Sequence, residues 1–300
     1  MNRISESMKI KYKWIIFFLS ALTLGFSSCG EEPITDSAIT IPSGPQTELD
    51  KWIDNTFRIP YNISVVYQWN NSVDEGDIIV PPKEELVQPF LKAVLKIWLT
   101  PYIRVADNKE NFMKDYSCRQ LNLVGSGRYS YNAVVLGQAQ NGYTITLYTV
   151  NQFDLEGKSI SRATLNEFFR TMHHEFAHIL NQRKPYDPNF QRITGNYSAD
   201  WTILSHAQAR ELGFISNYAR SAESEDFVEI FAYYCTSTES EWNALINTIK
   251  NTQSREYINL KAKFVRDYMK NSYNIDLEKL RDEITKAISE VANGNLEINE

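Results

Sequence analysis

The sequence is poor in cysteine, with three in 300 residues, at Cys29, Cys118 and Cys235. Two cysteines within a folded domain define no spacing pattern that would predict a disulfide framework. Cys118 and Cys235 can pair in an oxidising compartment, but their spacing does not require it. We do not expect either of them to be needed as a metal ligand.

The sequence also lacks an excess of positive charge. It has 31 Lys and Arg against 37 Asp and Glu, which gives a formal net charge of −6 at pH 7. Phosphate-binding surfaces are basic, so nothing here indicates a nucleic-acid partner. There are no internal repeats, and 300 residues with 43% hydrophobic content suffice for one domain with a sizeable core, or for one with two lobes.

The apolar run near the N-terminus is too short to span a bilayer comfortably. It covers thirteen residues, 14–26, and follows a basic segment that contains Arg3, Lys9, Lys11 and Lys13. Such a run is typical of the apolar part of a secretory signal peptide. We therefore predict that residues 1–28 are a signal peptide.

The end of this segment resembles the lipobox of bacterial lipoproteins. It reads Phe26-Ser27-Ser28-Cys29-Gly30, with small residues immediately before the cysteine. In such proteins this cysteine carries lipid and becomes the mature N-terminus. Phe26 departs from the Leu, Val or Ile that is usual at its position, whereas the acidic pair Glu31-Glu32 resembles a surface-export signal of some Gram-negative lipoproteins. The resemblance implies lipidation at Cys29 and an outer-membrane location, at the cell surface.

Residues 29–48 are polar and include three prolines, which predicts a flexible tether. Loss of residues 1–28 removes four basic residues and one acidic residue, which leaves 27 against 36 and a net charge of −9. We expect a single folded domain over 49–300. Its α+β lobe covers about 49–184 and its helical lobe about 185–293.

The hydrophobic patterns predict strands and helices in an α+β order. β-branched and aromatic or alternating segments indicate strands at 63–69, 120–124, 134–136 and 142–150. Apolar residues at helical spacing indicate helices at 83–102 and 161–184. A loop over 186–201 then precedes a short helix at 205–212 and a helix with an acidic first turn, which Ser221 or Ser224 can cap. Residues 241–293 read as two or three amphipathic helices.

The helix at 161–184 contains the pattern H-E-x-x-H, at His174-Glu175-Phe176-Ala177-His178. Residues four apart on a helix differ by about 40° in azimuth and about 6 Å in rise, so both imidazoles can reach one Zn²⁺ ion. A catalytic zinc keeps three protein ligands and one water. Glu175 lies where its carboxylate can reach that water as a general base. His173 is offset from the ligand face, so we expect it to pack or to support a ligand.

The third ligand is open from the residues alone. The metzincin extension would need Gly at 181 and His at 184, and the chain has Asn181 and Lys184, so that class is excluded. The remaining candidates are Asp200, His206, Glu225, Asp226 and Glu229. Glu225 and Glu229 lie one helical turn apart, so that one can ligate while the other supports the site.

The segment Asn217 to Phe231 resembles the segment of anthrax lethal factor that supplies its glutamate ligand and its active-site tyrosine. On this resemblance Glu225 is the third zinc ligand, Tyr218 the active-site tyrosine and Glu229 a supporting residue. Over nearly the whole chain, the blocks H-E-F-A-H, G-F-I-S-x-Y-A and E-D-F-x-E resemble the zinc metallopeptidase lipoproteins of Bacteroidetes-type bacteria. These are described as substrate-import-associated zinc metallohydrolases. They are found beside TonB-dependent importers and their lipoprotein partners.

We therefore expect a zincin-like α+β fold, in which a small mixed sheet packs on the H-E-x-x-H helix and a mainly helical part follows. The expected activity is that of a gluzincin-like peptidase, which acts on a peptide or protein substrate from an outer-membrane anchor. The alternative is a peptidase-derived lipoprotein that holds substrate for an importer without cleaving it. Retention of Glu175 and Tyr218 argues against it, since capture needs neither.

Overall fold

The computed structural model describes residues 46–69, 72–74, 77–109, 111–130, 133–140, 142–153 and 160–298. All of them belong to one unit, 46–300. The expected signal peptide, Cys29 and most of the expected tether lie outside the described residues. Among the described helices, none combines the length and the apolar character that a membrane span requires.

Helices that the hydrophobic pattern does not reveal begin the described chain. Thr47 and Asp50 form a reciprocal capping box at the start of α2 (Glu48–Ile53), which continues through η1 (Asp54–Arg58) and α3 (Ile59–Tyr61). The helix expected at 83–102 is present as a continuous stretch of α4 (Glu84–Val94), η2 (Leu95–Leu99) and α5 (Thr100–Val105). A short helix, α6 (Phe112–Tyr116), follows.

The sheet has four short strands in the order β1-β4-β8-β7. β1 (Ser64–Val66), β4 (Gln120–Leu123) and β8 (Thr144–Leu147) are parallel, and β7 (Gly137–Gln140) is an antiparallel edge strand. The strand expected at 142–150 is shorter because Thr149 adopts a left-handed φ of 62° before the turn η3 (Val150–Gln152). Two hairpins, β2 (Ser72–Asp74) with β3 (Asp77–Ile79) and β5 (Arg128–Ser130) with β6 (Ala133–Val135), complete this half.

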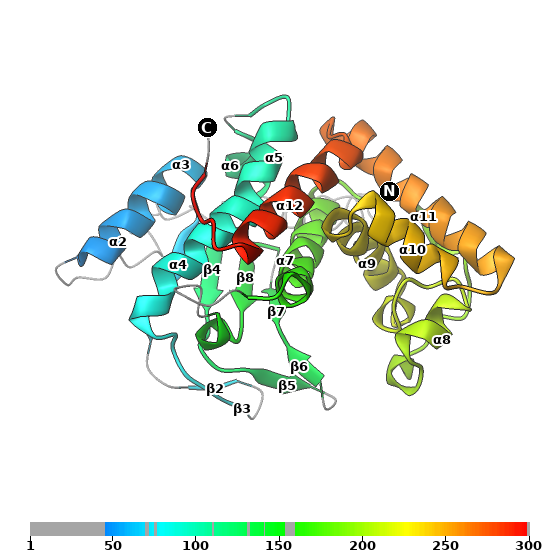
Figure 1. Ribbon diagram of the computed structural model, residues 1–300, viewed down its shortest axis with the longest axis horizontal. Coiled ribbons are helices and arrows are strands. Elements are labelled where there is room, and N and C mark those ends of the chain that lie inside the picture. The colour runs from blue at the N-terminus through cyan, green and yellow to red at the C-terminus, as the bar shows by residue number, and fades with distance from the viewer. Residues whose placement is uncertain are drawn as a thin grey trace, which may run out of the picture. The chain divides into compact units, whose positions relative to one another are not determined.

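Helices dominate the chain after the sheet (Figure 1). The long helix α7 (Arg162–Arg183) is followed by three 3-10 helices, one short α-helix and four longer helices. They are η4 (Pro188–Arg192), η5 (Trp201–Ile203), α8 (His206–Arg210), η6 (Tyr218–Arg220), α9 (Glu223–Thr236), α10 (Glu239–Asn247), α11 (Thr252–Tyr273) and α12 (Leu277–Ala292). The mixed α+β fold with a small mixed sheet and a mainly helical C-terminal part is therefore confirmed.

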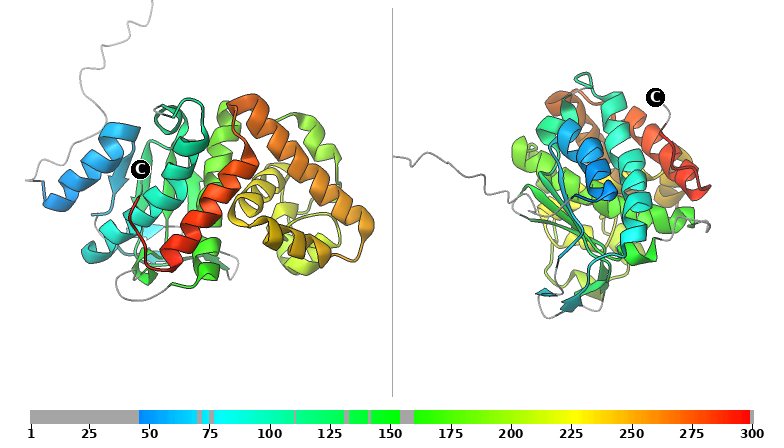
Figure 2. Two further views of the ribbon diagram at one scale, coloured as in Figure 1. Left: turned by 45° about the horizontal axis from the view of Figure 1, so that its top comes forward. Right: turned by 90° about the vertical axis from the view of Figure 1, so that its left-hand side faces the viewer.

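One hydrophobic core runs through both halves of this unit. It includes Trp98 and Phe176 in one half and Phe227 and Met269 in the other. The last helix, α12, returns to pack on α5 and α7 as well as α9, and it lies across the front of the molecule in both Figure 1 and the left view of Figure 2. The two expected lobes thus share a core. Cys118 and Cys235 are buried in it as free thiols.

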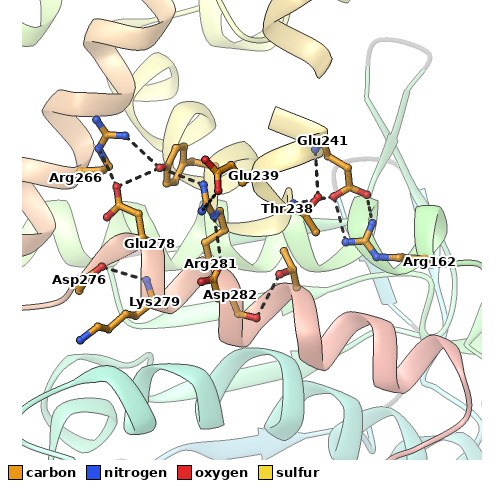
Figure 3. Close-up of polar contacts among 12 residues, drawn as sticks. Arg162, Thr238, Glu239, Glu241, Arg266, Asp276, Glu278, Lys279, Arg281 and Asp282 are labelled. Carbon is orange, nitrogen blue, oxygen red and sulfur yellow. Dashed lines mark hydrogen bonds and ion pairs between the residues drawn. The ribbon is translucent and has the colours of Figure 1, made fainter. Parts of the chain in front are cut away.

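Polar contacts join the C-terminal helices around Tyr234 of α9. Arg266 of α11 and Arg281 of α12 both donate to the Tyr234 hydroxyl, at 3.2 and 3.3 Å. Arg266 Nε also lies 3.4 Å from Glu278 Oε1 at the start of α12 (Figure 3). These contacts fix α9, which carries acidic site residues, against two further helices.

Candidate metal centre

The H-E-x-x-H helix forms because its sequence contains no helix breaker and is well capped. No Gly or Pro occurs between Ser161 and Lys184, and the Ser161 hydroxyl accepts a hydrogen bond from the Thr164 N–H at 3.1 Å. The helix ends at Arg183 and Lys184 is extended, as expected for a residue before proline. His173, His174 and Glu175 all lie in its buried middle section.

A second helix, α9, packs antiparallel to α7 at the site. His178 Nε2 lies 3.3 Å from Glu225 Oε2, and His174 Nδ1 lies 2.8 Å from Glu229 Oε1. A step of four residues toward the N-terminus of α7 therefore matches a step of four residues toward the C-terminus of α9, as antiparallel packing requires. The N-cap of α9 is Ala222, without a side-chain cap. The expectation that Ser221 or Ser224 caps this helix is therefore wrong.

His174, His178 and Glu225 form a cluster of three possible metal ligands. Their donor atoms all lie within 4.8 Å of one another, and they are the candidate metal-binding cluster found among the described residues. Glu225 Oε2 lies 3.1 Å from His174 Nε2 and 3.3 Å from His178 Nε2. Tetrahedral bonds of about 2.0–2.1 Å separate donors by about 3.3 Å, so the cluster fits zinc in donor chemistry and in these two spacings.

The pKa values of Glu225 and His174 are shifted by their contacts with one another, as expected for side chains that face one common point. Burial raises the pKa of the Glu225 carboxyl, but hydrogen bonds with His174 and His178 outweigh it and hold the pKa below its ordinary value. Burial lowers the pKa of His174, and Glu225 and Glu229 raise it to well above the ordinary value. Each imidazole therefore faces negative charge in the place where a ligand nitrogen would face a cation.

Glu229 supports His174 from behind the cluster. Its Oε1 accepts from His174 Nδ1 at 2.8 Å, which leaves Nε2 directed at Glu225. Its Oε2 accepts from the Ser216 hydroxyl, and Ser216 Oγ in turn accepts from the Ala219 N–H at 3.0 Å. A carboxylate on the remote ring nitrogen fixes both the tautomer and the orientation of a metal-binding histidine.

The G-F-I-S block at 213–216 is the segment that presents Ser216. Gly213 has a φ of +88°, and a Cβ there would lie 2.9 Å from Thr194 Cγ2, so the turn requires glycine. The Gly213 carbonyl accepts from Lys261 Nζ at 2.9 Å. Lys261 Nζ also lies 2.6 Å from Asp226 Oδ2, and both side chains are fully buried. Asp226 is therefore an ion-pair partner that ties α9 to α11, away from the donor cluster.

A cleft of about 1080 Å³ opens beside the cluster. His174, Glu175 and Glu225 line it, together with Tyr218 and Glu229. Glu175 is 8% exposed, so most of its side chain is buried while part of it is open to the cleft. Burial raises the pKa of Tyr218, and the negative charges of Glu225 and Glu175 raise it further. Its ring centroid lies 5.9 Å from that of His174.

The remaining candidate residues lie outside the cluster. His206 lines the cleft with Trp201, but its Nδ1 accepts from the Asn217 N–H at 3.2 Å. Asp200 is exposed. His173 is fully buried with Nδ1 3.0 Å from the Tyr102 hydroxyl, and burial lowers its pKa to about 3, so it is a packing residue.

The fold and this cluster define a class of protein: an α+β protein in which two antiparallel helices bring together two histidines and a glutamate that could hold a metal ion. Residues 43–278 match the family described as "Putative zinc-binding metallo-peptidase", and the chain belongs to that family. A crystal structure of "a putative zinc-binding metallo-peptidase" from Bacteroides caccae is similar, with a TM-score of 0.70 and 31% identity over 84% of this chain and 97% of that chain. No curated protein matches the sequence.

The sequence did not reveal the site residues whose role depends on how helices and turns pack together. Ser216 lies within a quoted block, yet only its contact with Glu229 gives it a role. Arg170 is one turn before His174, and Arg210 is in α8; both line the cleft. Of these residues, only Arg170 could have been recognised from the sequence, because it lies one turn before His174 on the ligand face of α7.

Proposed function

We propose that the chain is a zinc-dependent hydrolase that cleaves peptide bonds. The observation that carries this proposal is Glu175, which lines the cleft directly beside a donor cluster that is complete without it. A protein that only held a metal ion, or only captured a peptide, would have no use for a carboxylate at this position. The family description agrees with a peptidase.

The residues of the chain divide the reaction between them. His174, His178 and Glu225 would hold zinc, which when bound supplies a Lewis acid that polarises a carbonyl and lowers the pKa of water. Glu175 accepts the proton of the attacking water and passes it to the leaving amine, so that it ends the cycle as a carboxylate. The Tyr218 hydroxyl donates to the carbonyl oxygen as that atom gains negative charge.

The wall of the cleft favours an extended substrate. Gly137, the first residue of the edge strand β7, lines the cleft, and a Cβ at this position would lie 2.8 Å from Thr171 Cγ2 of α7. The glycine thus lets the edge strand press against the helix that carries the donors. An edge strand offers backbone N–H and C=O groups to a peptide in extended conformation.

We further propose that Cys29 carries lipid and anchors the protein to the outer membrane, where it works beside a TonB-dependent importer and its lipoprotein partner. The support is the lipobox-like sequence at 26–30 and the resemblance to import-associated lipoproteins.

The Glu175→Gln variant tests the hydrolase proposal. Because Glu175 is outside the donor cluster, the variant should keep about one zinc per chain while peptide turnover falls by about 10²–10⁴-fold. Metal analysis and cleavage of a peptide library, with and without a chelator, measure both quantities. Full turnover in the variant would contradict the mechanism. A parent protein that binds zinc and cleaves nothing would favour the substrate-holding alternative.

A further inference from the structure

The contact between α7 and α9 continues beyond the metal-binding cluster with the same register. After His178–Glu225 and His174–Glu229, the next step along both helices pairs Arg170 with Tyr233. The Arg170 guanidinium lies 4.1 Å from the centre of the Tyr233 ring. Successive pairs on a helix lie about 6 Å apart, so Arg170 is one turn from the position that a metal ion would take.

An ion pair lies beyond these α7–α9 contacts, at the N-terminal end of α7. Arg162, the first residue of α7, is paired with Glu241 of α10, and Arg162 Nη2 lies 3.2 Å from Glu241 Oε2 (Figure 3). Between this ion pair and Arg170 lies Asn166, and Asn166, Arg170, Tyr233 and Glu241 all line the cleft. The cleft therefore extends along α7 for about two further turns, from the donor cluster to Asn166, and ends near the Arg162–Glu241 pair.

Two polar atoms of this part of the wall lack partners. Asn166 Oδ1 and Arg170 Nε are both buried, with no hydrogen-bond partner among the described residues. Leaving such an atom unsatisfied destabilises the protein, and more so when the group is charged. Both residues lie on the cleft side of α7, where a bound ligand can supply the missing partners.

A second arginine, Arg210 of α8, approaches the same place. Its Nε donates to the Ile215 carbonyl at 2.9 Å, which orients the guanidinium at the cleft wall. Partial burial lowers the pKa of His206, and the positive charges of Arg210 and Arg170 lower it further. Burial raises the pKa of Tyr233, and the positive charges of Arg170 and Arg210 oppose this rise. Arg170, Arg210, His206 and Tyr233 all line the same cleft, so the two guanidinium groups lie in one region of it.

Within the described residues, neither arginine is neutralised by an acidic side chain at ion-pair distance. Three of the carboxylates that line the cleft have other contacts: Glu225 faces the two histidines, Glu229 binds His174 and Ser216, and Glu241 pairs with Arg162. Glu167, on the same stretch of helix, is exposed. Two cations thus remain in a concave, partly dehydrated wall, where an anionic ligand gains most from them.

We propose that Arg170, assisted by Arg210, binds a carboxylate of the substrate one helical turn from the metal-binding position. Arginine forms two parallel hydrogen bonds with a carboxylate, and the Tyr233 ring holds the Arg170 guanidinium flat against the wall. An extended peptide advances about 3.3 Å per residue. One helical turn therefore corresponds to about two residues from the scissile bond. The carboxylate is that of an Asp or Glu side chain or that of the peptide C-terminus.

The test compares matched peptide pools on the full-length, zinc-loaded protein. One library of N-acetylated hexapeptides ends in a free carboxylate and the other in a carboxamide, and each is divided into pools with Asp and Glu or with Asn and Gln at internal positions. We expect pools that carry the recognised carboxylate to show kcat/KM values about 10–100-fold higher than their neutral counterparts. The C-terminal pair and the internal pair distinguish the two sources of carboxylate.

The variant Arg170→Gln should bring this ratio close to one while zinc content stays unchanged, and Arg170→Lys should restore part of it. Arg183→Gln is the matched control, because Arg183 is an exposed arginine of the same helix that does not line the cleft; it should keep the full ratio. An equal loss on charged and neutral pools would show that Arg170 does not bind the substrate carboxylate, and would overturn the proposal. So would a parent protein without preference.

The substrate preference rests on the proposed hydrolase function, so a binding measurement separates the two. Calorimetric titration of the same pools into Glu175→Gln should show tighter binding of the carboxylate pools, and the additional Arg170→Gln substitution should abolish the difference. If the parent cleaves nothing but this difference is found, the hydrolase proposal fails and the carboxylate site stands. If cleavage occurs and no difference is found in either measurement, the site fails alone.

Discussion

Replacement of Lys261 by methionine should destabilise the protein strongly, although Lys261 does not line the cleft. Its Nζ lies 2.6 Å from Asp226 Oδ2, and both side chains are 0% exposed. Methionine keeps most of the length and apolar stem of lysine, so the main loss is the charge. It leaves Asp226 buried with the Tyr197 hydroxyl, which lies 2.9 Å from Oδ2, and it removes the donor to the Gly213 carbonyl.

The magnitude follows from the complete burial of the pair. Breaking a buried ion pair by removing one partner costs about 3–5 kcal/mol. For a folded unit of this size, 1 kcal/mol corresponds to about 2–4 °C in Tm, so Lys261→Met should lower Tm by about 6–20 °C. The double variant Lys261→Met/Asp226→Leu should recover most of this loss, because it leaves no unpaired buried charge.

Lys263→Met is the matched control two residues away on the same helix. Lys263 pairs with Asp267 on the surface, with side chains 60% and 54% exposed, and such a pair contributes about 0.3–0.5 kcal/mol. Calorimetric unfolding of both variants in excess chelator removes the contribution of metal binding. A loss below about 1 kcal/mol for Lys261→Met, or an equal loss for both variants, would refute the reasoning.

Three further predictions concern the site and the anchor. Glu229→Ala should weaken zinc binding by about 10–100-fold, and Glu225→Ala should weaken it further, because Glu225 contacts both imidazoles at Nε2; competition with a chromogenic chelator measures both, and the reverse order would exchange their roles. Tyr218→Phe should lower kcat by about 10²–10³-fold with KM and zinc content nearly unchanged, whereas the exposed Tyr143→Phe should change nothing; a full kcat would remove Tyr218 from the mechanism. Cys29→Ala should move the protein out of the detergent phase on phase partitioning, and unchanged partitioning would contradict the lipid anchor.

The fold was predictable from the sequence where hydrophobic periodicity is strong, and less so elsewhere. α7 and the stretch from α4 to α5 follow from apolar residues at helical spacing, because long runs of one pattern leave little choice of structure. The edge strand β7 and helix α2 were not expected. β7 is a four-residue segment, G-Q-A-Q, whose conformation depends on pairing with β8 and on contact with α7. Strand propensity is largely a property of such surroundings.

The sequence by itself determined the pair His174 and His178 and the place of Glu175 beside them. One turn of helix fixes their relative positions, since the geometry of an α-helix is the same in every protein. It also presented Glu225 and Glu229 on one face of a second helix. Which of the two faces the Nε2 atoms was open from that spacing alone, and the family resemblance favoured Glu225.

Only the tertiary structure decided how the two helices meet. The contacts His178–Glu225 and His174–Glu229 join residues 47 and 55 positions apart in the chain, and a shift of one turn between α7 and α9 would exchange the two glutamates. That register depends on how the side chains of both helices, the G-F-I-S turn and the buried Lys261–Asp226 pair pack together. The same packing places Arg170 against Tyr233 and in the same cleft as Arg210, and no local pattern in the sequence encodes this meeting of three helices.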